Sequence, residues 1–401
     1  MNTTLTHRSQ RIISLALLFC VNVFAVAYIA TDKKSKTKPT PYTFPVAYAK
    51  DYMNIPADNP MTDEGVELGR YLFYDGRLSG RTDSLMSCAS CHKQSKSFEC
   101  GIDHPLYKGG KTFGLTGIPT PHVMMPLINL VWINEGYMWN GMVCENNETY
   151  GGRYGVPISK EFHQKNIESF VWMMIVAPHE CNGSIEQSVS VIRSIPMYPP
   201  MFKKAFGDEE INIDRISKAI AQFVRSLVSF DSKFDRFMRG EIQLTESERR
   251  GFYIFETEKG DCFHCHGSPA LPLWTTNMFM NNAKDEDFAD KNDRSSFTKN
   301  QMDKGKYRVP TLRNVEFTAP YMHDGRFKTL DEVLDFYNSG LKRSPYVDPL
   351  MIGVNHGGMH LTDEEIQDLK AFILTLSDTN FLVNPKYSNP CPDNPYFISD
   401  K

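Results

Sequence analysis

Two short stretches of this 401-residue chain carry the residue types and the spacing of a redox cofactor site. The first is Cys88-Ala89-Ser90-Cys91-His92, and the second is Cys262-Phe263-His264-Cys265-His266. Both follow the pattern C-x-x-C-H, which is typical of covalent c-type haem attachment. In such a site the two thiols bind the porphyrin, and the following histidine becomes an axial ligand of the iron. The sequence therefore predicts two haems, one on Cys88, Cys91 and His92 and one on Cys262, Cys265 and His266.

A Cys-x-x-Cys pair on its own also suits a disulfide or half of a zinc site. Three features favour haem: histidine follows both pairs, an export leader precedes them, and a helix is expected to lead into Cys262. His264, inside the second motif, we expect near the surface or near a haem propionate and not as a ligand. Two haems allow one site to do chemistry while the other supplies electrons.

The composition is that of an ordinary globular protein, with 41% hydrophobic residues, 23% charged residues and a formal net charge of −4. The length suffices for two modest domains. Nucleic-acid binding is not expected, because it calls for a strongly basic domain or stripe. Of nine cysteines, four belong to the haem motifs and Cys20 to the leader. The others permit disulfides whose pairing the sequence cannot assign, and they are Cys100, Cys144, Cys181 and Cys391.

The N-terminus has the pattern of a targeting segment. Arg8 and Arg11 precede an apolar run over 12–30, and a charged stretch follows it. Residues 1–30 are therefore predicted to be a signal peptide or an N-terminal membrane anchor, followed by a linker over 31–45. We expect the protein in the periplasm, either soluble after signal cleavage or anchored to the inner membrane. Export agrees with the haem motifs, because c-type haem is attached on the far side of that membrane.

The elements that position the motifs are predicted to be helices. Apolar residues recur at helical spacing within 209–240, which predicts a helix that connects two halves. Capping boxes at Thr245, Thr329 and Thr362 predict three further helices, and no long β alternation occurs. The fold class is therefore mainly α, with two cytochrome c-like haem domains. The predicted division is 46–208 for the first haem domain, 209–240 for the connecting helix, 241–385 for the second haem domain and 386–401 for a C-terminal tail.

Longer motifs surround the two haem sites. The stretch 68–79, Leu-Gly-Arg-Tyr-Leu-Phe-Tyr-Asp-Gly-Arg-Leu-Ser, precedes the first site. The stretches 308–315, Arg-Val-Pro-Thr-Leu-Arg-Asn-Val, and 318–325, Thr-Ala-Pro-Tyr-Met-His-Asp-Gly, follow the second. This ordered set resembles the bacterial di-haem cytochrome c peroxidases and their relatives, the di-haem enzymes that mature tryptophylquinone cofactors. The resemblance implies a peroxidatic haem in the first domain and an electron-transfer haem in the second.

The resemblance also assigns roles to residues between the haem motifs. In the family a tryptophan of a Trp-Asp-Gly stretch helps electrons pass between the haems, and Trp139 in Trp-Asn-Gly matches it. The catalytic acid/base of the family is a glutamate in Pro-x-Glu-Met, and Glu180 in Pro-His-Glu-Cys matches it. A carboxyl group can take a proton from peroxide and return it when burial raises its pKa. Glu168 is the rival. Phe170 stands where the family often has glutamine, which puts the polarity of the peroxide pocket in question.

The sixth ligand of the second haem separates the branches of the family. The peroxidases have a methionine fourteen residues after the histidine of His-Asp-Gly, and here that position is Tyr337. Tyrosine resembles the cofactor-maturing branch, and a phenolate stabilises ferric iron. Met359 is the runner-up, and Met351 also lies close enough in sequence to reach the iron. His104 and His122 fall where some peroxidases carry a blocking histidine, but neither matches.

Family members also hold a calcium ion between their domains. Thr318 and Pro320 match the carbonyl donors of that site. The asparagine donor is expected near Val123 or Met124, and neither side chain offers an oxygen. Calcium is therefore allowed by the resemblance and unsupported by the residues.

The sequence thus predicts a di-haem cytochrome c peroxidase that reduces hydrogen peroxide to water. A small reduced cytochrome or cupredoxin-type protein would deliver electrons to the C-terminal haem, and these would pass to the N-terminal haem. Two alternatives stay open. One is a peroxide-dependent di-haem oxidase of a protein or organic substrate, which Tyr337 favours. The other is a non-catalytic di-haem electron-transfer cytochrome, which Phe170 allows.

Overall fold

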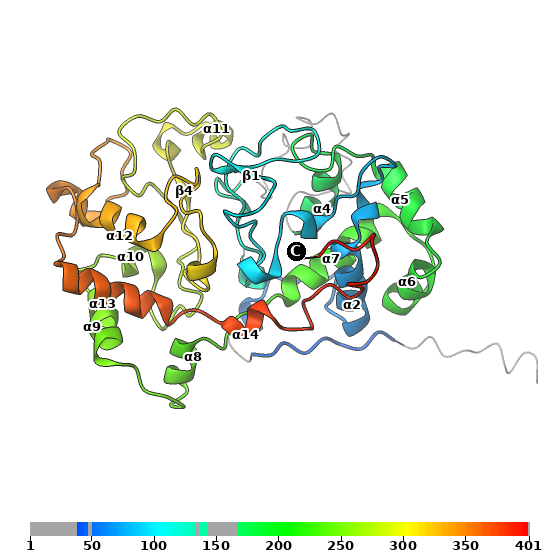
Figure 1. The fold of residues 1–401 in the computed structure, drawn as a ribbon, viewed down its shortest axis with the longest axis horizontal. Coiled ribbons are helices and arrows are strands. Elements are labelled where there is room, and N and C mark those ends of the chain that lie inside the picture. The colour runs from blue at the N-terminus through cyan, green and yellow to red at the C-terminus, as the bar shows by residue number, and fades with distance from the viewer. Residues whose placement is uncertain (1–37, 47–49, 134–135, 143–166, 400–401) are drawn as a thin grey trace, which may run out of the picture. The chain divides into compact units, whose positions relative to one another are not determined.

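The structure is a computed structural model that describes residues 38–46, 50–133, 136–142 and 167–399 (Figure 1). The chain forms two compact units, Met1–Lys38 and Pro39–Lys401, and the description below concerns the second. The predicted leader, Cys20 and Cys144 lie outside the described residues. Within the described residues, no helix has the length and the apolar character needed to cross a bilayer.

Helices dominate the described chain, which confirms the mainly α prediction, and the strands are only two residues long. Strands β1 (Tyr107–Lys108) and β2 (Lys111–Thr112) pair antiparallel with Tyr107 opposite Thr112. Strands β3 (Phe279–Met280) and β4 (Tyr307–Arg308) pair antiparallel with Phe279 opposite Arg308. The helices are α2 (Asp63–Tyr74), α4 (Ile167–Val176), α5 (Ile185–Ser194), α6 (Tyr198–Phe206), α7 (Ile213–Ser226), α8 (Lys233–Met238), α9 (Glu246–Phe255), α10 (Phe263–His266), α11 (Ser295–Thr298), α12 (Leu330–Ser339), α13 (Asp363–Leu374) and α14 (Thr379–Leu382).

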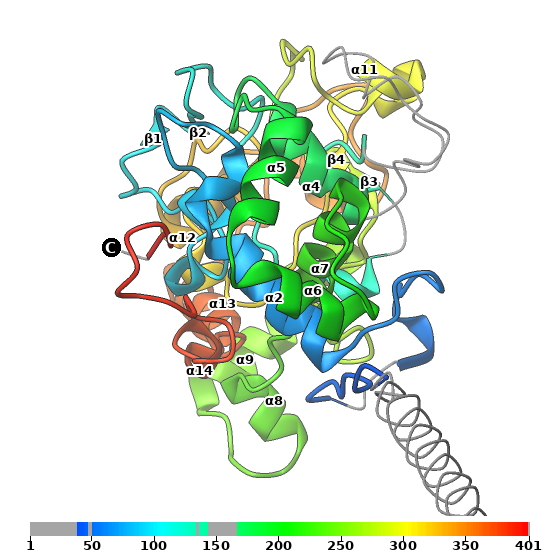
Figure 2. The ribbon, with the colours of Figure 1, turned by 90° about the vertical axis from the view of Figure 1, so that its right-hand side faces the viewer.

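One helix crossing organises the first half of the chain. Helix α2 begins at the N-cap Thr62, whose side chain accepts a hydrogen bond from the Gly65 N–H, and it packs against α7 (Figure 2). Gly69 lies at the crossing, where a Cβ atom would overlap the backbone carbonyl oxygen of Ala219. Only glycine allows the two backbones to approach this closely. The crossing places the loop after α2, which carries the first haem motif, beside the hydrophobic cluster of this half.

A second crossing of the same kind organises the other half. Helix α9 packs against α13, and Gly251 lies at the contact, where a Cβ atom would overlap the carbonyl oxygen of Asp368. Both helices begin with the predicted capping boxes, at Thr245 and at Thr362, and the box at Thr329 begins α12. These three helix predictions are confirmed. Helix α9 runs toward the second haem motif, which begins at Cys262.

The connecting helix predicted over 209–240 is in fact two helices, α7 and α8. The chain between them bonds to a loop: the Leu227 carbonyl accepts from the Asn129 N–H over 2.8 Å, and the Ser229 N–H donates to Asn129 Oδ1 over 3.0 Å. A new capping box between Ser232 and Asp235 then begins α8. The helical period of the apolar residues could not reveal this break, because a loop distant in sequence supplies the competing hydrogen bonds.

The segment after α14 folds back onto the first half, near α2 and α7 in Figure 1. Phe381 and Tyr387 belong to the hydrophobic cluster of that half. Gln94 donates to the Phe381 carbonyl over 3.1 Å, and the Tyr74 hydroxyl donates to the Tyr387 carbonyl over 2.7 Å. The C-terminal segment thus contributes to the core beside the first haem motif. The domain boundaries predicted from the sequence stay a prediction.

Candidate functional site

Two cavities of nearly equal size contain the predicted site residues. The first, of about 210 Å³, is lined by Cys88, Cys91, His92, Trp139 and Glu180, with apolar side chains around them. The second, of about 200 Å³, also has a mainly apolar wall. It is lined by Cys262, Cys265, His266, Tyr337, Met351 and Met359. The structure therefore groups the residues as the sequence motifs predict, one C-x-x-C-H to each cavity, and Trp139 lines both cavities.

The two motifs adopt the same kind of backbone turn. In the first, the Cys88 carbonyl accepts hydrogen bonds from the Cys91 N–H over 3.2 Å and from the His92 N–H over 2.9 Å. In the second, the Cys262 carbonyl accepts from the N–H groups of Cys265 and His266 over 3.3 and 2.9 Å. The turn brings both thiols and the histidine of each motif to the wall of one cavity.

Both motif histidines have the neutral charge state that an iron ligand requires. His92 Nδ1 lies 2.6 Å from the Phe98 carbonyl oxygen. A carbonyl can only accept, so Nδ1 carries the proton and Nε2 keeps its lone pair. Burial lowers the pKa of His92 to about 4, and burial likewise lowers the pKa of His266 to about 4. Both imidazoles are therefore neutral near pH 7.

The alternatives to haem do not fit the motif cysteines. All four motif thiols are free, and so are Cys100, Cys181 and Cys391, which leaves no disulfide among the described cysteines. Among the residues that the structure describes, only Glu258, Asp261 and His264 bring three potential metal-ligand atoms within 4.8 Å of one another. None of the four motif cysteines belongs to that group. Paired thiols and a neutral histidine in an apolar cavity fit covalent haem.

Glu180 is the carboxyl group of the first cavity. It follows α4 in a turn, in which its N–H donates to the Ala177 carbonyl over 3.0 Å. Burial raises the pKa of its carboxyl group to about 8. A carboxyl group with this pKa exchanges protons near neutral pH, which is the property that acid/base catalysis requires. Glu180 thus lines the first cavity, and its role as the proton carrier stays a prediction.

Glu168, the rival carboxyl group, lies outside the cavity wall. Arg225 donates to both of its carboxylate oxygens, over 2.6 and 2.8 Å, and Asn59 donates to one of them over 2.6 Å. The Arg225 side chain is completely buried. Glu168 is therefore the counter-ion of a buried arginine between α4 and α7. Phe170, on the same helix, lines the first cavity and packs edge-on against Tyr137.

Trp139 is held by hydrogen bonds between the two halves. Its indole N–H donates to the Val123 carbonyl over 2.9 Å, and its own carbonyl accepts from the Arg308 N–H over 2.6 Å. The next residue, Asn140, is buried and donates to the Asn292 carbonyl over 2.6 Å. A carboxylate cannot donate that bond, so the asparagine at this position has a structural reason.

Tyr337 lines the second cavity from α12. Its hydroxyl oxygen accepts a hydrogen bond from Asn282 Nδ2 over 3.0 Å. Burial raises its pKa, opposed by the hydrogen bond from Asn282. Met359 lies beside it, and the Met359 N–H donates to the Tyr337 carbonyl over 3.1 Å. The cavity wall thus contains all three predicted ligands, Tyr337, Met351 and Met359, and the choice among them stays a prediction.

The other histidines named from the sequence have polar partners. His104 Nδ1 accepts from the Leu106 N–H over 3.1 Å, and His264 Nδ1 lies 2.6 Å from an oxygen of Asp261. His122 Nε2 lies 2.7 Å from Asp290 Oδ2. Val123 and Met124, near which the resemblance places a calcium ligand, line the first cavity with apolar side chains. A calcium ion thus has no side-chain donor at these two positions.

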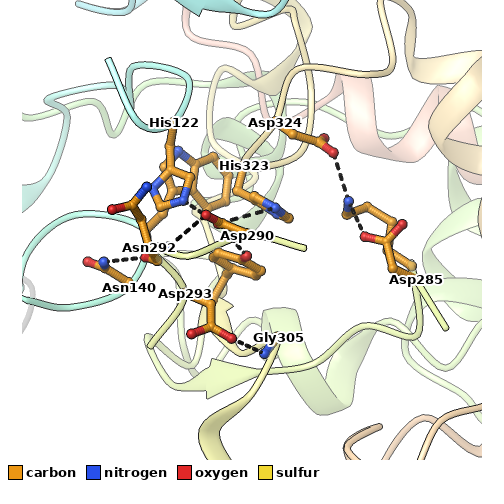
Figure 3. Close-up of polar contacts among 12 residues, drawn as sticks. His122, Asn140, Asp285, Asp290, Asn292, Asp293, Gly305, His323 and Asp324 are labelled. Carbon is orange, nitrogen blue, oxygen red and sulfur yellow. Dashed lines mark hydrogen bonds and ion pairs between the residues drawn. The ribbon is translucent and has the colours of Figure 1, made fainter. Parts of the chain in front are cut away.

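Sequence reasoning missed four polar residues between the cavities, Asp290, Tyr307, Arg308 and His323. Arg308 lines both cavities, and Tyr307 and His323 line the second. Figure 3 shows Asp290 between His122 and His323. Arg308 and His323 stand in the motifs that carry the family resemblance, so a signal existed for those two. Asp290 lies in an irregular loop with no signal of its own.

Comparisons with known proteins show which proteins this chain resembles. A family model described as di-haem cytochrome c peroxidase matches residues 63–243. The chain is 31% identical over 335 residues to the methylamine utilization protein MauG of Methylorubrum extorquens, and the match covers 80% of each protein. It is 32% identical over 286 residues to cytochrome c551 peroxidase of Nitrosomonas europaea, covering 70% of this chain and 75% of the relative. A solved MauG-like protein associated with microbial copper homeostasis superposes with a TM-score of 0.73 at 31% identity, covering 87% of this chain and 99% of that one.

Proposed function

Because the chain belongs to the di-haem cytochrome c peroxidase family, whose members are oxidoreductases that act on peroxide, we propose that it reduces hydrogen peroxide to water in its first cavity. A small reduced cytochrome or cupredoxin-type protein delivers the electrons to the second haem site, and they pass from there to the first. The family implies two c-type haems, and the four motif cysteines with His92 and His266 would hold them.

One observation carries this assignment. Glu180, whose pKa burial raises to about 8, lines the cavity that contains His92 and does not line the other cavity. Reduction of one hydrogen peroxide molecule to two water molecules consumes two electrons and two protons. Glu180 lines the first cavity, whereas the second is lined by the potential ligands Tyr337, Met351 and Met359. The first cavity is therefore suited to proton chemistry and the second to electron transfer.

The residues of the first cavity have separate roles in the proposed reaction. When bound, the haem supplies the iron at which the oxygen–oxygen bond breaks and electrons arrive. His92 presents Nε2 to the cavity, because the Phe98 carbonyl holds the proton of Nδ1. Glu180 takes a proton from the bound peroxide and returns it to the leaving oxygen. Phe170 and the other apolar side chains exclude water, and this burial raises the pKa of Glu180 into the range in which it exchanges protons.

Trp139 is the proposed electron carrier between the sites. It lines both cavities, and its hydrogen bonds to Val123 and Arg308 hold it between the halves. The predicted leader and the haem motifs support a periplasmic location, either soluble after cleavage or anchored to the membrane. These assignments of electron direction, donor class and location are parts of the same proposal.

The test is steady-state peroxide reduction by the haem-loaded protein with a reduced small cytochrome. Turnover in the wild type and a loss of about a hundredfold in Glu180→Gln are expected, since acid/base groups contribute about this much or more. A fully active variant would remove Glu180 from the mechanism. A wild-type protein whose reduced haems are both low-spin and do not react with peroxide would instead be a non-catalytic electron carrier.

A second candidate function has Tyr337 in its favour. In this function the same peroxide chemistry withdraws electrons from a protein or organic substrate, without a reduced donor. The similarity of this chain to MauG of Methylorubrum extorquens supports this second candidate function. Peroxide consumption that is slow with reduced cytochrome but accelerated by an oxidisable protein substrate would favour it over the peroxidase.

A further inference from the structure

A polar cluster outside the proposed proton chemistry lies between the two cavities (Figure 3). His122 Nε2 and the Tyr307 hydroxyl both lie 2.7 Å from Asp290 Oδ2, and His323 Nε2 lies 4.0 Å from the same oxygen. His122 lines the first cavity, whereas Tyr307 and His323 line the second. The cluster therefore connects the walls of the two sites through one carboxylate.

Aromatic rings continue from this cluster to Trp139. The rings of Tyr307 and His323 are stacked, with centroids 3.5 Å apart and an interplanar angle of 12°. The ring centroids of Trp139 and His323 are 6.5 Å apart. In addition, the N–H of Arg308, the neighbour of Tyr307, donates to the Trp139 carbonyl. Trp139 and Tyr307 are thus both ring neighbours of His323.

Trp139 and Tyr307 donate their side-chain hydrogen bonds to acceptors of different basicity. The Trp139 indole donates to a backbone carbonyl, which is too weak a base to take the proton. The Tyr307 hydroxyl donates to a carboxylate at a distance that permits proton transfer. Burial favours the neutral form of Asp290, but the hydrogen bonds from His122 and Tyr307 hold its pKa below the usual range, so it is ionised. A base is therefore in place for Tyr307 and not for Trp139.

We propose that Tyr307 acts together with Trp139 in relaying electrons between the two haem sites, and that it passes its phenol proton to Asp290 each time it is oxidised. The inference rests on the proposed function, in which hydrogen peroxide is the oxidant of the first site. Tyr307 loses one electron to the oxidised first site while its O–H bond breaks, which leaves a neutral tyrosyl radical and a protonated Asp290. An electron from the second site and the return of the same proton restore the phenol and the carboxylate.

The surrounding charges allow the proton to stay within the pair. Lys284 is a cation close to this cluster, and it is engaged by Asp324 over 2.9 Å and by Asp285 over 2.6 Å. Asp293 accepts from the Gly305 N–H and from Ser295. The carboxylates of Asp285, Asp293 and Asp324 are thus bonded to other partners. Asp290 is the carboxylate that accepts the hydrogen bond from the Tyr307 hydroxyl.

A purely structural cluster would contribute to stability but would produce neither a tyrosine radical nor a proton-coupled rate. Tyr307→Phe keeps the stacked ring and removes the proton, and Asp290→Asn keeps an acceptor and removes the base. Tyr321→Phe is the matched control, because Tyr321 lines the same cavity but its hydroxyl donates to the Val315 carbonyl over 3.0 Å. Thermal unfolding and haem absorption of each variant establish that it is folded and loaded.

The first measurement mixes haem-loaded protein, with the second site ferrous and the first ferric, with hydrogen peroxide in H₂O and in D₂O. In the wild type and in Tyr321→Phe, oxidation of the second site is expected to slow in D₂O. In Tyr307→Phe and Asp290→Asn it is expected to be slower by about tenfold or more, which corresponds to a barrier higher by about 1.4 kcal/mol. The solvent isotope effect is expected to disappear.

The second measurement does not depend on turnover. The fully ferric protein, labelled with ring-deuterated tyrosine, is freeze-quenched after stoichiometric peroxide and examined by electron paramagnetic resonance. A tyrosine radical narrowed by the label is expected in the wild type and in Tyr321→Phe, and is expected to be absent from Tyr307→Phe.

Two results would overturn the relay: no tyrosine radical in the wild type, or a Tyr307→Phe protein that matches the wild type in transfer rate and radical signal. The proposed function survives either result if the wild type turns over peroxide with a reduced donor. Conversely, absence of that turnover defeats the proposed peroxidase, while a radical that depends on Tyr307 still supports the relay.

Discussion

Arg225 donates to both carboxylate oxygens of Glu168, over 2.6 and 2.8 Å, from a completely buried position. This ion pair separates two glutamates that lie only twelve positions apart in the sequence. The carboxylate of Glu168 is committed to a cation, whereas Glu180 lines a cavity. The two residues are therefore expected to respond in opposite ways to the same substitution.

Glu168→Gln is expected to destabilise the protein, because it leaves the buried charge of Arg225 without its counter-ion. Removal of one partner of a buried pair costs about 3 kcal/mol. Denaturant unfolding of the haem-loaded protein at pH 7 measures the loss. An unfolding free energy equal to that of the wild type would show that the pair contributes nothing.

Glu180→Gln is expected to stabilise the protein at neutral and alkaline pH. Burial raises the pKa of Glu180 from an ordinary value of 4.5 to about 8, so the folded state holds a proton that the unfolded state releases. Wild-type stability is therefore lost progressively as the pH rises from about 4.5 to about 8, and the glutamine variant escapes this loss. The unfolding free energies of the wild type and of Glu180→Gln, measured across this range, should diverge with rising pH and run parallel above pH 8.

Glu99 provides a matched control for Glu180. Burial raises its pKa to about 8 as well, but it does not line the first cavity, and its carboxylate accepts from the Gly101 N–H. Glu99→Gln should therefore show the same sign of pH-dependent stability change and leave peroxide kinetics as in the wild type. A loss of peroxide activity in Glu99→Gln would mean that burial of a carboxyl group, and not its place in the cavity, explains the effect at Glu180.

Gly251→Ala is expected to weaken the crossing of α9 and α13. The new Cβ would overlap the Asp368 carbonyl oxygen, so the helices must separate. Overpacking of this kind costs about 1–3 kcal/mol, or more where backbone must move. Arg249→Ala, at an exposed position of the same helix, should change stability by less than about 0.5 kcal/mol. Thermal unfolding compares the two, and equal melting temperatures would contradict the close approach.

Tyr337→Phe is expected to change the absorption spectrum and the reduction potential of the second haem, because it removes the phenol oxygen and keeps the ring. Met359→Leu and Met351→Leu remove the rival sulfur ligands from the same cavity wall. The three variants together identify the ligand, since only one of them should alter the ferric spectrum. An unchanged spectrum in Tyr337→Phe would exclude the tyrosine.

Local signals in the sequence predicted the parts of the fold that depend on neighbouring residues. The capping boxes at Thr245, Thr329 and Thr362 begin helices, because a box is satisfied within its own turn. The break between α7 and α8 was not predictable in this way, since Asn129 supplies the hydrogen bonds that replace the helical ones.

The candidate site likewise combines residues that the sequence predicted with contacts that it did not predict. Spacing alone grouped each pair of cysteines with its histidine, and the family motif pointed to Trp139 and Glu180. The contact between His122 and Asp290 joins residues 168 positions apart. Neither residue belongs to a motif or to a regular helix, so only the folded chain reveals that His122 and Tyr307 both bond to Asp290.

The most direct test of the account is a single mixing experiment. Protein with a ferrous second haem and a ferric first haem is mixed with hydrogen peroxide, and the absorption of the second haem is followed in the wild type and in Glu180→Gln. The account predicts rapid oxidation of the second haem in the wild type, at a rate proportional to peroxide concentration, and a rate lower by about a hundredfold in the variant. Peroxide consumption that leaves the second haem ferrous, or equal rates in the two proteins, would contradict it.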